Sequence, residues 1–168
     1  MGVKKAKVFT ISSVKGGTGK TTTALNLAGV FANMNLKTLI IDLDLFSGGI
    51  GLSLNIDVTK NIFTAIDDMN NNRFTNLDDY IVKYNNDIDV LSAPIDPRLA
   101  SKINVNYINV LLRKAKMKYK IIIVDTNHVL NDINLMTFDC SDKIVYVINN
   151  DPTSLKNMKT MLSIHKDM

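Results

Sequence analysis

The glycine-rich segment at residues 12–22, SSVKGGTGKTT, is the feature that most constrains the fold of this chain. It follows an apolar run at residues 8–11 that is typical of a buried parallel strand, and it opens a stretch with helical periodicity. Glycines between a strand and a helix let successive backbone N–H groups turn toward one anion. The sequence therefore predicts a phosphate-binding loop, and a glycine-rich turn that holds no ligand is the weaker alternative.

Each part of this loop has an expected task in binding a nucleotide. Lys20 places a positive charge at the terminal phosphates, and the Thr21 hydroxyl is a candidate Mg²⁺ ligand. The helix that begins near Thr21 adds the positive end of its dipole. The residues predicted to bind the nucleotide are Lys15, Gly16, Gly17, Thr18, Gly19, Lys20, Thr21 and Thr22.

Apolar runs and helical stripes alternate along the rest of the chain. Continuous apolar runs at residues 8–11, 38–41, 121–124 and 144–148, with a weaker one at 88–91, predict parallel strands. Three helical stripes lie between or after them: Ala24, Leu27, Ala28 and Phe31; Ile103, Tyr107, Leu111 and Ala115; and Leu155, Met158 and Leu162. This order predicts a doubly wound α/β fold, a mainly parallel sheet in a Rossmann-like three-layer arrangement.

Two segments outside this pattern also carry expectations. The polar tract at residues 69–73 is interpreted as a surface loop. The last helical stripe is interpreted as an outer-layer helix that covers the sheet, with a helix lying on a membrane surface as the alternative.

Composition limits the classes of protein that remain. A chain of 168 residues suits one domain, and it has no apolar run near the ~20 residues that span a bilayer. A single cysteine, Cys140, fits a reducing cytoplasm and leaves too few thiolates for an iron–sulfur site. The net charge of +4 permits weak contact with DNA or an anionic membrane. We therefore expect a cytoplasmic protein without a transmembrane segment.

The loop also resembles a known motif. Residues 15–21, KGGTGKT, resemble the deviant Walker A motif of the ParA/MinD family of P-loop ATPases, in which an early lysine precedes the usual one. In that family the early lysine, here Lys15, reaches the phosphates of the partner subunit in a nucleotide-sandwich dimer. The resemblance implies a slow, Mg²⁺-dependent ATPase that dimerises with ATP, and Lys15, Lys20 and Asp44 are its implied catalytic residues.

Two further segments resemble motifs of the same family. Residues 38–44, TLIIDLD, end in a D-x-D pattern, and residues 120–125, KIIIVD, resemble the Walker B strand. The resemblance implies that Asp44 positions the attacking water, that Asp42 lies near the metal and that Asp125 holds Mg²⁺. With Thr21, these three carboxylates form the implied metal set. Carboxylates at the carboxyl ends of parallel strands face the ligand crevice, although each alone could equally be a turn residue.

A finer resemblance concerns the branch of the family. Residues 47–54, 88–94, 96–100 and 151–157 resemble the CpaE/TadZ pilus-assembly branch, which places a secretion or pilus machine at a cell pole. This implies protein partners of a polar or membrane machine, and recruitment to a cell pole or to the inner membrane surface. Family members continue past the position of Met168. The resemblance therefore implies that residues 1–168 are a single P-loop ATPase domain, the N-terminal portion of a ParA/MinD-type domain, and that the part supplying the adenine pocket lies outside them.

Departures from the family keep other functions open. Asn127 stands where the family commonly has proline after the metal-site aspartate, and we expect it to loosen that turn. His128 is interpreted as a structural residue and not as a base. A ParA-type DNA-partition ATPase is one alternative function. A non-catalytic nucleotide-binding scaffold is the other, and the absence of Glu and Gln from the sequence keeps it in view.

Overall fold

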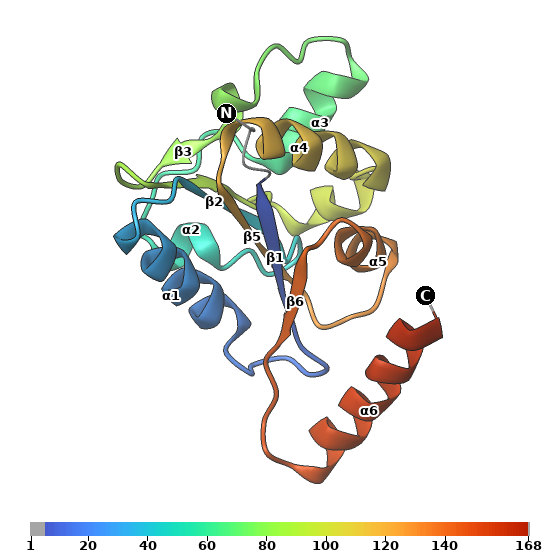
Figure 1. Cartoon of the computed structure of the whole chain (residues 1–168). Coiled ribbons are helices and arrows are strands. Elements are labelled where there is room, and N and C mark those ends of the chain that lie inside the picture. Colours follow the sequence, from blue (N-terminus) through green and yellow to red (C-terminus); the bar gives the residue numbers. More distant parts are fainter. Residues whose placement is uncertain (1–5, 168) are drawn as a thin grey trace.

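The computed structural model describes residues 6–167, which form a six-stranded sheet with helices on both faces (Figure 1). The strands are β1 (Lys7–Ser12), β2 (Thr38–Leu43), β3 (Val82–Lys83), β4 (Ile88–Leu91), β5 (Ile121–Thr126) and β6 (Lys143–Tyr146). Their order is β3-β4-β2-β5-β1-β6, and all neighbours are parallel except the pair β3 and β4. The predicted doubly wound, mainly parallel sheet is confirmed.

Two hydrophobic cores lie on the two faces of this sheet. The helices are α1 (Lys20–Asn33), α2 (Ile50–Ser53), α3 (Ile62–Asn70), α4 (Val105–Lys118), α5 (Asp132–Asp139) and α6 (Pro152–Asp167), with short 3₁₀ turns η1 (Leu77–Tyr80) and η2 (Pro97–Lys102). On one face α1 and α2 pack over Ile40 and Ile123, and on the other α3 and α4 pack over Ile41 and Val124. The central strands are therefore buried on both sides, which explains why they are apolar without alternation.

Several elements differ from the sequence-based expectations. The last strand ends at Tyr146 rather than at residue 148. The helical stripe that starts at Ile103 in the sequence forms α4 only from Val105 onward, because Asn104 caps this helix by accepting a hydrogen bond from Asn106 N. The tract at 69–73 is a loop only in part, since α3 extends to Asn70. α3 is held at its start by Asn61 and Thr64, which form a reciprocal capping box.

The expectation for the C-terminal helix is wrong. In Figure 1, α6 extends away from the sheet and does not cover a face of it. Met158 is buried, but Leu155 and Leu162 are about half exposed. The inner residues of α6, among them Met161 and Ile164, line a small cavity with Val14 and Leu130 instead. The helix therefore borders the glycine-rich loop, at the end of the sheet where the carboxyl ends of the strands lie.

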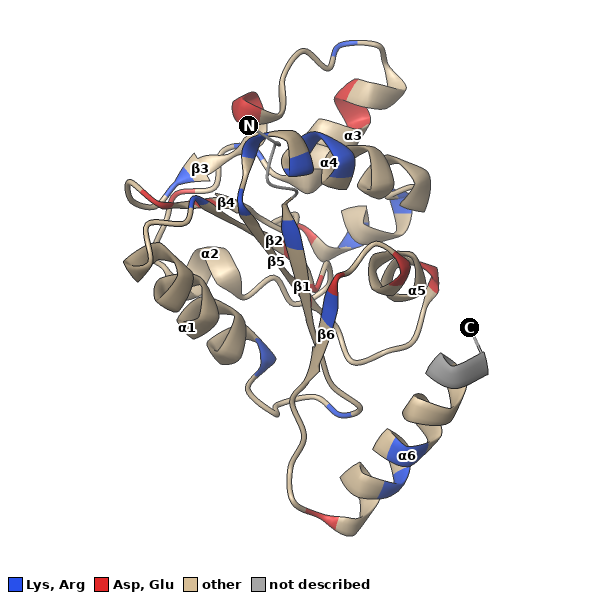
Figure 2. Cartoon of the chain, in the orientation of Figure 1, with Lys and Arg blue, Asp and Glu red and all other residues tan. Residues whose placement is uncertain are grey.

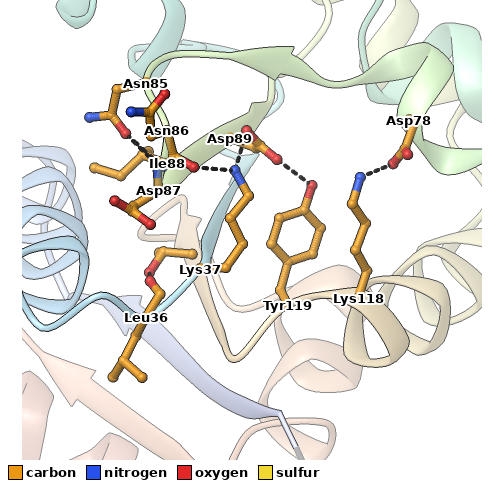
Figure 3. A network of polar contacts seen from close by, with 11 residues as sticks. Leu36, Lys37, Asp78, Asn85, Asn86, Asp87, Ile88, Asp89, Lys118 and Tyr119 are labelled. Atoms are coloured by element: carbon orange, nitrogen blue, oxygen red, sulfur yellow. Dashed lines mark hydrogen bonds and ion pairs between the residues drawn. The ribbon is translucent and has the colours of Figure 1, made fainter.

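A buried polar network ties the opposite end of the sheet together (Figure 3). Asp89 in β4 is 1% exposed, and its two carboxylate oxygens accept hydrogen bonds from Lys37 Nζ at 2.9 Å and from the Tyr119 hydroxyl at 2.8 Å. Lys37 Nζ also donates to the carbonyl oxygen of Asn86. Because the network joins the segments that lead into β2, β4 and β5, it fixes the amino ends of three neighbouring strands.

We expect Asp89→Ala to lower the free energy of unfolding by about 3 kcal/mol, because it leaves Lys37 and a buried tyrosine hydroxyl without their partner. Urea unfolding followed by circular dichroism measures this loss. Lys7→Ala is the matched control, since Lys7 pairs with Asp142 while 60% exposed, and it should cost less than about 1 kcal/mol. Equal losses in the two variants would contradict the structural role assigned to the network.

Candidate functional site

The glycine-rich loop connects the carboxyl end of β1 to the first turn of α1. Gly17 and Gly19 have φ values of 71° and 95°, a left-handed region that side chains with a Cβ rarely adopt. Gly19 is the N-cap of α1, and no side chain in the described part of the molecule caps this helix, which leaves its amino end open toward the loop. The Ser13 hydroxyl donates to the carbonyl oxygen of Lys15 at 2.6 Å and fixes the entry into the loop. This geometry leaves the backbone N–H groups of the loop and the positive end of the α1 dipole available to an anion.

Thr21 and Asp125 meet beside this loop. The Thr21 hydroxyl in α1 donates to Asp125 Oδ2 at the end of β5, at 2.6 Å. Asp125 is fully buried, and within the described part of the chain no donor reaches its Oδ1. Burial raises the pKa of Asp125 to about 6, although the Thr21 hydrogen bond and the charge of Lys20 lower it. The Thr21 hydroxyl and the unpartnered oxygen of Asp125 are ligands that suit Mg²⁺, which also takes phosphate oxygens and water as ligands.

Asp42 lies next to Asp125 across the pair of strands β2 and β5. Its two oxygens accept hydrogen bonds from the backbone N–H groups of Asp44 and Ile50, both at 3.1 Å. Burial raises the pKa of Asp42 to about 7, and the charge of Asp125 contributes to the rise. Asp42 thus holds the turn between β2 and α2 in place with both of its carboxylate oxygens.

Asp44 is half-buried in the same turn, close enough to raise the pKa values of Asp42 and Asp125 by its charge. Across residues 6–167, however, no three acidic, histidine or cysteine side chains converge as a group that could hold a metal. Of the four residues expected at the metal, Thr21 and Asp125 are in direct contact. Asp42 and Asp44 lie beside them, and their roles as ligands stay predictions.

The two lysines of the loop have different surroundings. Lys20 is only 8% exposed, and its charge acts on Asp125. Lys15 is exposed, and none of the ion pairs among the described residues includes it. Its charge lowers the pKa of Asp151, the residue just before α6, although hydrogen bonds from Ser154 contribute more to that lowering. The structure therefore directs one lysine toward the site and leaves the other at the surface.

Sequence reasoning missed the hydrogen bonds that hold the turn after Asp125. The amide of Asn134 in α5 donates to the side-chain and backbone oxygens of Asn127. The expectation that Asn127 loosens this turn is therefore wrong for this structure, since the asparagine side chain accepts hydrogen bonds that a proline could not. His128 lies beside Gly16 of the glycine-rich loop, where a Cβ on that glycine would be 3.6 Å from the imidazole ring. No spacing in the sequence indicates either contact, because both join residues from different elements.

The raised pKa values predict that the nucleotide-free protein loses stability as the pH rises. The folded protein holds protons on Asp42 and Asp125 that the unfolded chain releases near pH 3.8, so stability falls between about pH 4 and about pH 7 and then levels off. Urea unfolding at several pH values measures this slope, and Asp42→Asn should reduce it. Asp57→Asn is the control, because it changes an exposed carboxylate in the segment between α2 and α3. A slope that is unchanged by Asp42→Asn would contradict this assignment.

No helix in the described range is both long and apolar enough to cross a membrane.

Comparison with known proteins identifies relatives of this chain. The family model AAA_31, described as an AAA domain, matches residues 6–168. An uncharacterized protein of Methanocaldococcus jannaschii is 28% identical over 165 residues, which cover 92% of this chain and 63% of that protein. The septum site-determining protein MinD of Synechocystis is 29% identical over 120 residues, which cover 71% of this chain and 44% of MinD. The chain therefore spans less than two thirds of the length of these relatives.

Solved structures of ParA and MinD proteins share the fold of this chain. A ParA family ATPase from Chlorobium tepidum superposes with a TM-score of 0.87 at 20% identity, covering 99% of this chain and 69% of that one. MinD from Pyrococcus horikoshii, solved with Mg-ADP, superposes with a TM-score of 0.81 at 25% identity, covering 96% of this chain and 66% of that one.

Proposed function

The chain belongs to the AAA_31 family of AAA domains and is related to the ParA and MinD ATPases, and on this premise we propose that it binds Mg-ATP and hydrolyses it slowly as a molecular switch. In this proposal, residues 1–168 act as one ATPase domain or as the N-terminal portion of one. ATP binding brings two copies together, and hydrolysis releases them.

The contact between Thr21 and Asp125 carries this proposal. It joins the first turn of α1 to the end of β5, beside a glycine-rich loop whose backbone takes left-handed φ values. A buried oxygen on Asp125 has no donor within the described residues, and such an atom is costly unless something binds it. Thr21 and Asp125 would hold a Mg²⁺ ion with its bound water, and such an ion would give this oxygen a partner.

The remaining residues divide the chemistry of phosphoryl transfer between them. Mg²⁺, when bound, offsets negative charge on the terminal phosphates. The N–H groups of the glycine-rich loop bind phosphate oxygens, and Lys20 adds a positive charge at the terminal phosphates. Asp44 orients the attacking water, and Lys15, which is exposed here, reaches the phosphates of the partner copy. Because the transition state is loose, positioning and charge do most of the work.

In the cell, we propose that the switch positions a larger machine. The relationship to a septum site-determining MinD supports a positioning role, and the sequence resemblance to the CpaE/TadZ branch favours a pilus or secretion machine among the possible cargoes. In either case the ATP-bound form binds protein partners at a cell pole or at the inner membrane surface.

A role in DNA partition is the alternative, and it is supported by the likeness to the chromosome partitioning protein ParA of Myxococcus xanthus, which is 42% identical over 62 residues, or 36% of this chain and 22% of that protein. Figure 2 shows Lys and Arg residues gathered on α4. Part of this charge has partners within the chain, since Lys118 pairs with Asp78 and Lys114 lies 5.1 Å from the centre of the Phe74 ring. DNA binding that needs ATP and falls steeply with added salt would favour partition over the positioning of a protein machine.

We expect Asp44→Ala to retain Mg-ATP binding and to lower phosphate release about 100-fold, because the attacking water loses the carboxylate that orients it. The variant should accumulate as an ATP-bound dimer. Phosphate release and sedimentation velocity with Mg-ATP measure the two effects. Asp57→Ala, in an exposed position after α2, is the control and should behave like the parent. Normal turnover in Asp44→Ala would remove Asp44 from the mechanism, and no turnover in the parent would favour the non-catalytic scaffold.

A further inference from the structure

The loop at residues 127–131 connects β5, the strand that carries Asp125, to α5. One side chain of α5 donates several hydrogen bonds to this loop. The Asn134 amide nitrogen, in the first turn of α5, donates to three oxygens of this loop. These are the backbone and side-chain oxygens of Asn127, at 3.2 and 3.0 Å, and the backbone oxygen of Val129, at 2.7 Å. Asn134 is 2% exposed and Asn127 is 8% exposed. A buried amide from α5 therefore holds the loop, together with hydrogen bonds that the loop residues Asn127 and Asn131 accept.

The hydrogen-bonding capacity of Asn134 is used unevenly. Its amide group has two N–H donors for three acceptors, so the acceptors share them. Turning the amide over would place its oxygen against these three oxygens, which fixes the orientation. Its Oδ1 is buried and has no donor within residues 6–167. A buried oxygen without a partner raises the free energy of this loop conformation. The free-energy difference to a second loop conformation, in which the oxygen has a donor, is therefore smaller than it would be if Oδ1 were paired.

The loop at residues 127–131 lies beside the glycine-rich loop and begins two residues after Asp125. Asn127 follows Asp125 by two residues, and its side chain accepts a second hydrogen bond from Val129 N at 2.9 Å, which folds the loop on itself. The next residue, His128, lies beside Gly16. The loop therefore lies between the strand end that carries Asp125 and the glycine-rich loop, and a movement of the loop changes the contact between His128 and Gly16.

We propose that Asn134 is a positioning residue, which holds the loop at residues 127–131 in the conformation from which ATP binding releases it. This role of Asn134 rests on the proposed ATPase function. Asn134 is the side chain that sets how the loop responds to ATP. Asn134 itself contacts neither nucleotide nor metal. It acts through Asn127 and Val129, and its loss should alter turnover and loop movement more than ATP affinity.

The test uses a fluorescent reporter in the loop. The chain contains no tryptophan and Val129 is 53% exposed, so Val129→Trp places a single tryptophan in the loop without disturbing the core. With Mg-ATP, the emission of this reporter chain should shift. When Asn134→Ala is added, the emission without nucleotide should already differ, and the ATP-dependent change should shrink about fivefold.

Turnover of the same variants separates a positioning role from a purely structural one. Asn134→Ala should lower kcat about tenfold and leave the Kd for Mg-ATP within about twofold. Thr137→Ala is the matched control: Thr137 is buried one turn further along α5, and among the described residues its hydroxyl bonds to the Ile133 carbonyl oxygen alone, within that helix. It should keep the turnover and the reporter response of the parent. Asn127→Ala removes one of the three acceptors, and its turnover and reporter response should lie between those of Asn134→Ala and Thr137→Ala. It replaces Asn134→Ala in the test if that variant does not fold.

Two outcomes would overturn different claims. A reporter chain that binds no Mg-ATP would overturn the proposed function, and the positioning role with it. If the reporter chain binds and hydrolyses ATP, but Asn134→Ala and Asn127→Ala both match Thr137→Ala in turnover and emission, only the positioning role of Asn134 is overturned.

Discussion

Lys15→Ala should bind Mg-ATP with nearly the affinity of the parent and lose at least about 100-fold in ATP turnover. Lys15 is exposed and is absent from the ion pairs among the described residues, so its removal leaves the site of its own subunit intact. In the proposed dimer it offsets charge on the phosphates of the partner copy, and this contribution exists only in the paired state. Equilibrium binding and phosphate release on the same preparation measure the two effects.

Mixing two inactive variants distinguishes this role from a local one. In a pair formed from Lys15→Ala and Asp44→Ala chains, one site keeps Asp44 and receives Lys15 from the partner. Random pairing at equal amounts should restore roughly a quarter of the parent activity, because half of the pairs are mixed and one of their two sites is complete. No recovery on mixing, or full turnover by Lys15→Ala alone, would contradict a lysine that acts across the dimer.

Lys20→Ala should have the opposite effect and lower the affinity for Mg-ATP about 100-fold. Lys20 is 8% exposed at the start of α1, and its charge already lowers the pKa of Asp125. Its removal takes a cation from a site that must bind several negative charges. Calorimetric titration with Mg-ATP measures the loss, and thermal unfolding verifies that the variant is folded.

The control for this variant is Lys120→Ala, an exposed lysine just before β5 at the opposite end of the sheet. It removes the same charge from the chain without altering the site, so its affinity should equal that of the parent. Equal affinities in Lys20→Ala and Lys120→Ala would show that the glycine-rich loop does not bind the nucleotide as proposed.

Much of the architecture could be predicted because its signals are local. The continuous apolar run at residues 121–124 indicates a strand covered on both faces, and it lies in β5 between β1 and β2. The glycines at 17 and 19 indicate a backbone that needs left-handed φ values, and both have them. The aspartates at 42 and 125 end neighbouring strands, as expected for residues that face one crevice.

Other features depend on contacts between distant residues, which leave no periodic signal. The two-residue strand β3 exists because it pairs with β4, and it is too short to show alternation. The apolar stripe of α6 predicts a buried face, but it does not indicate which surface covers it. The hold of Asn134 on Asn127 joins a helix to a loop, and only the folded chain brings them together. The ligand roles of Asp42 and Asp44 likewise depend on a metal and stay predictions.

Sedimentation velocity with Mg-ATP, with Mg-ADP and without nucleotide, with phosphate release followed in the same samples, tests the proposed switch most directly. We expect a dimer with Mg-ATP alone, slow release of phosphate and return to the monomer as ATP is consumed. A monomer in all three conditions, with no phosphate released, would contradict an ATP-dependent switch.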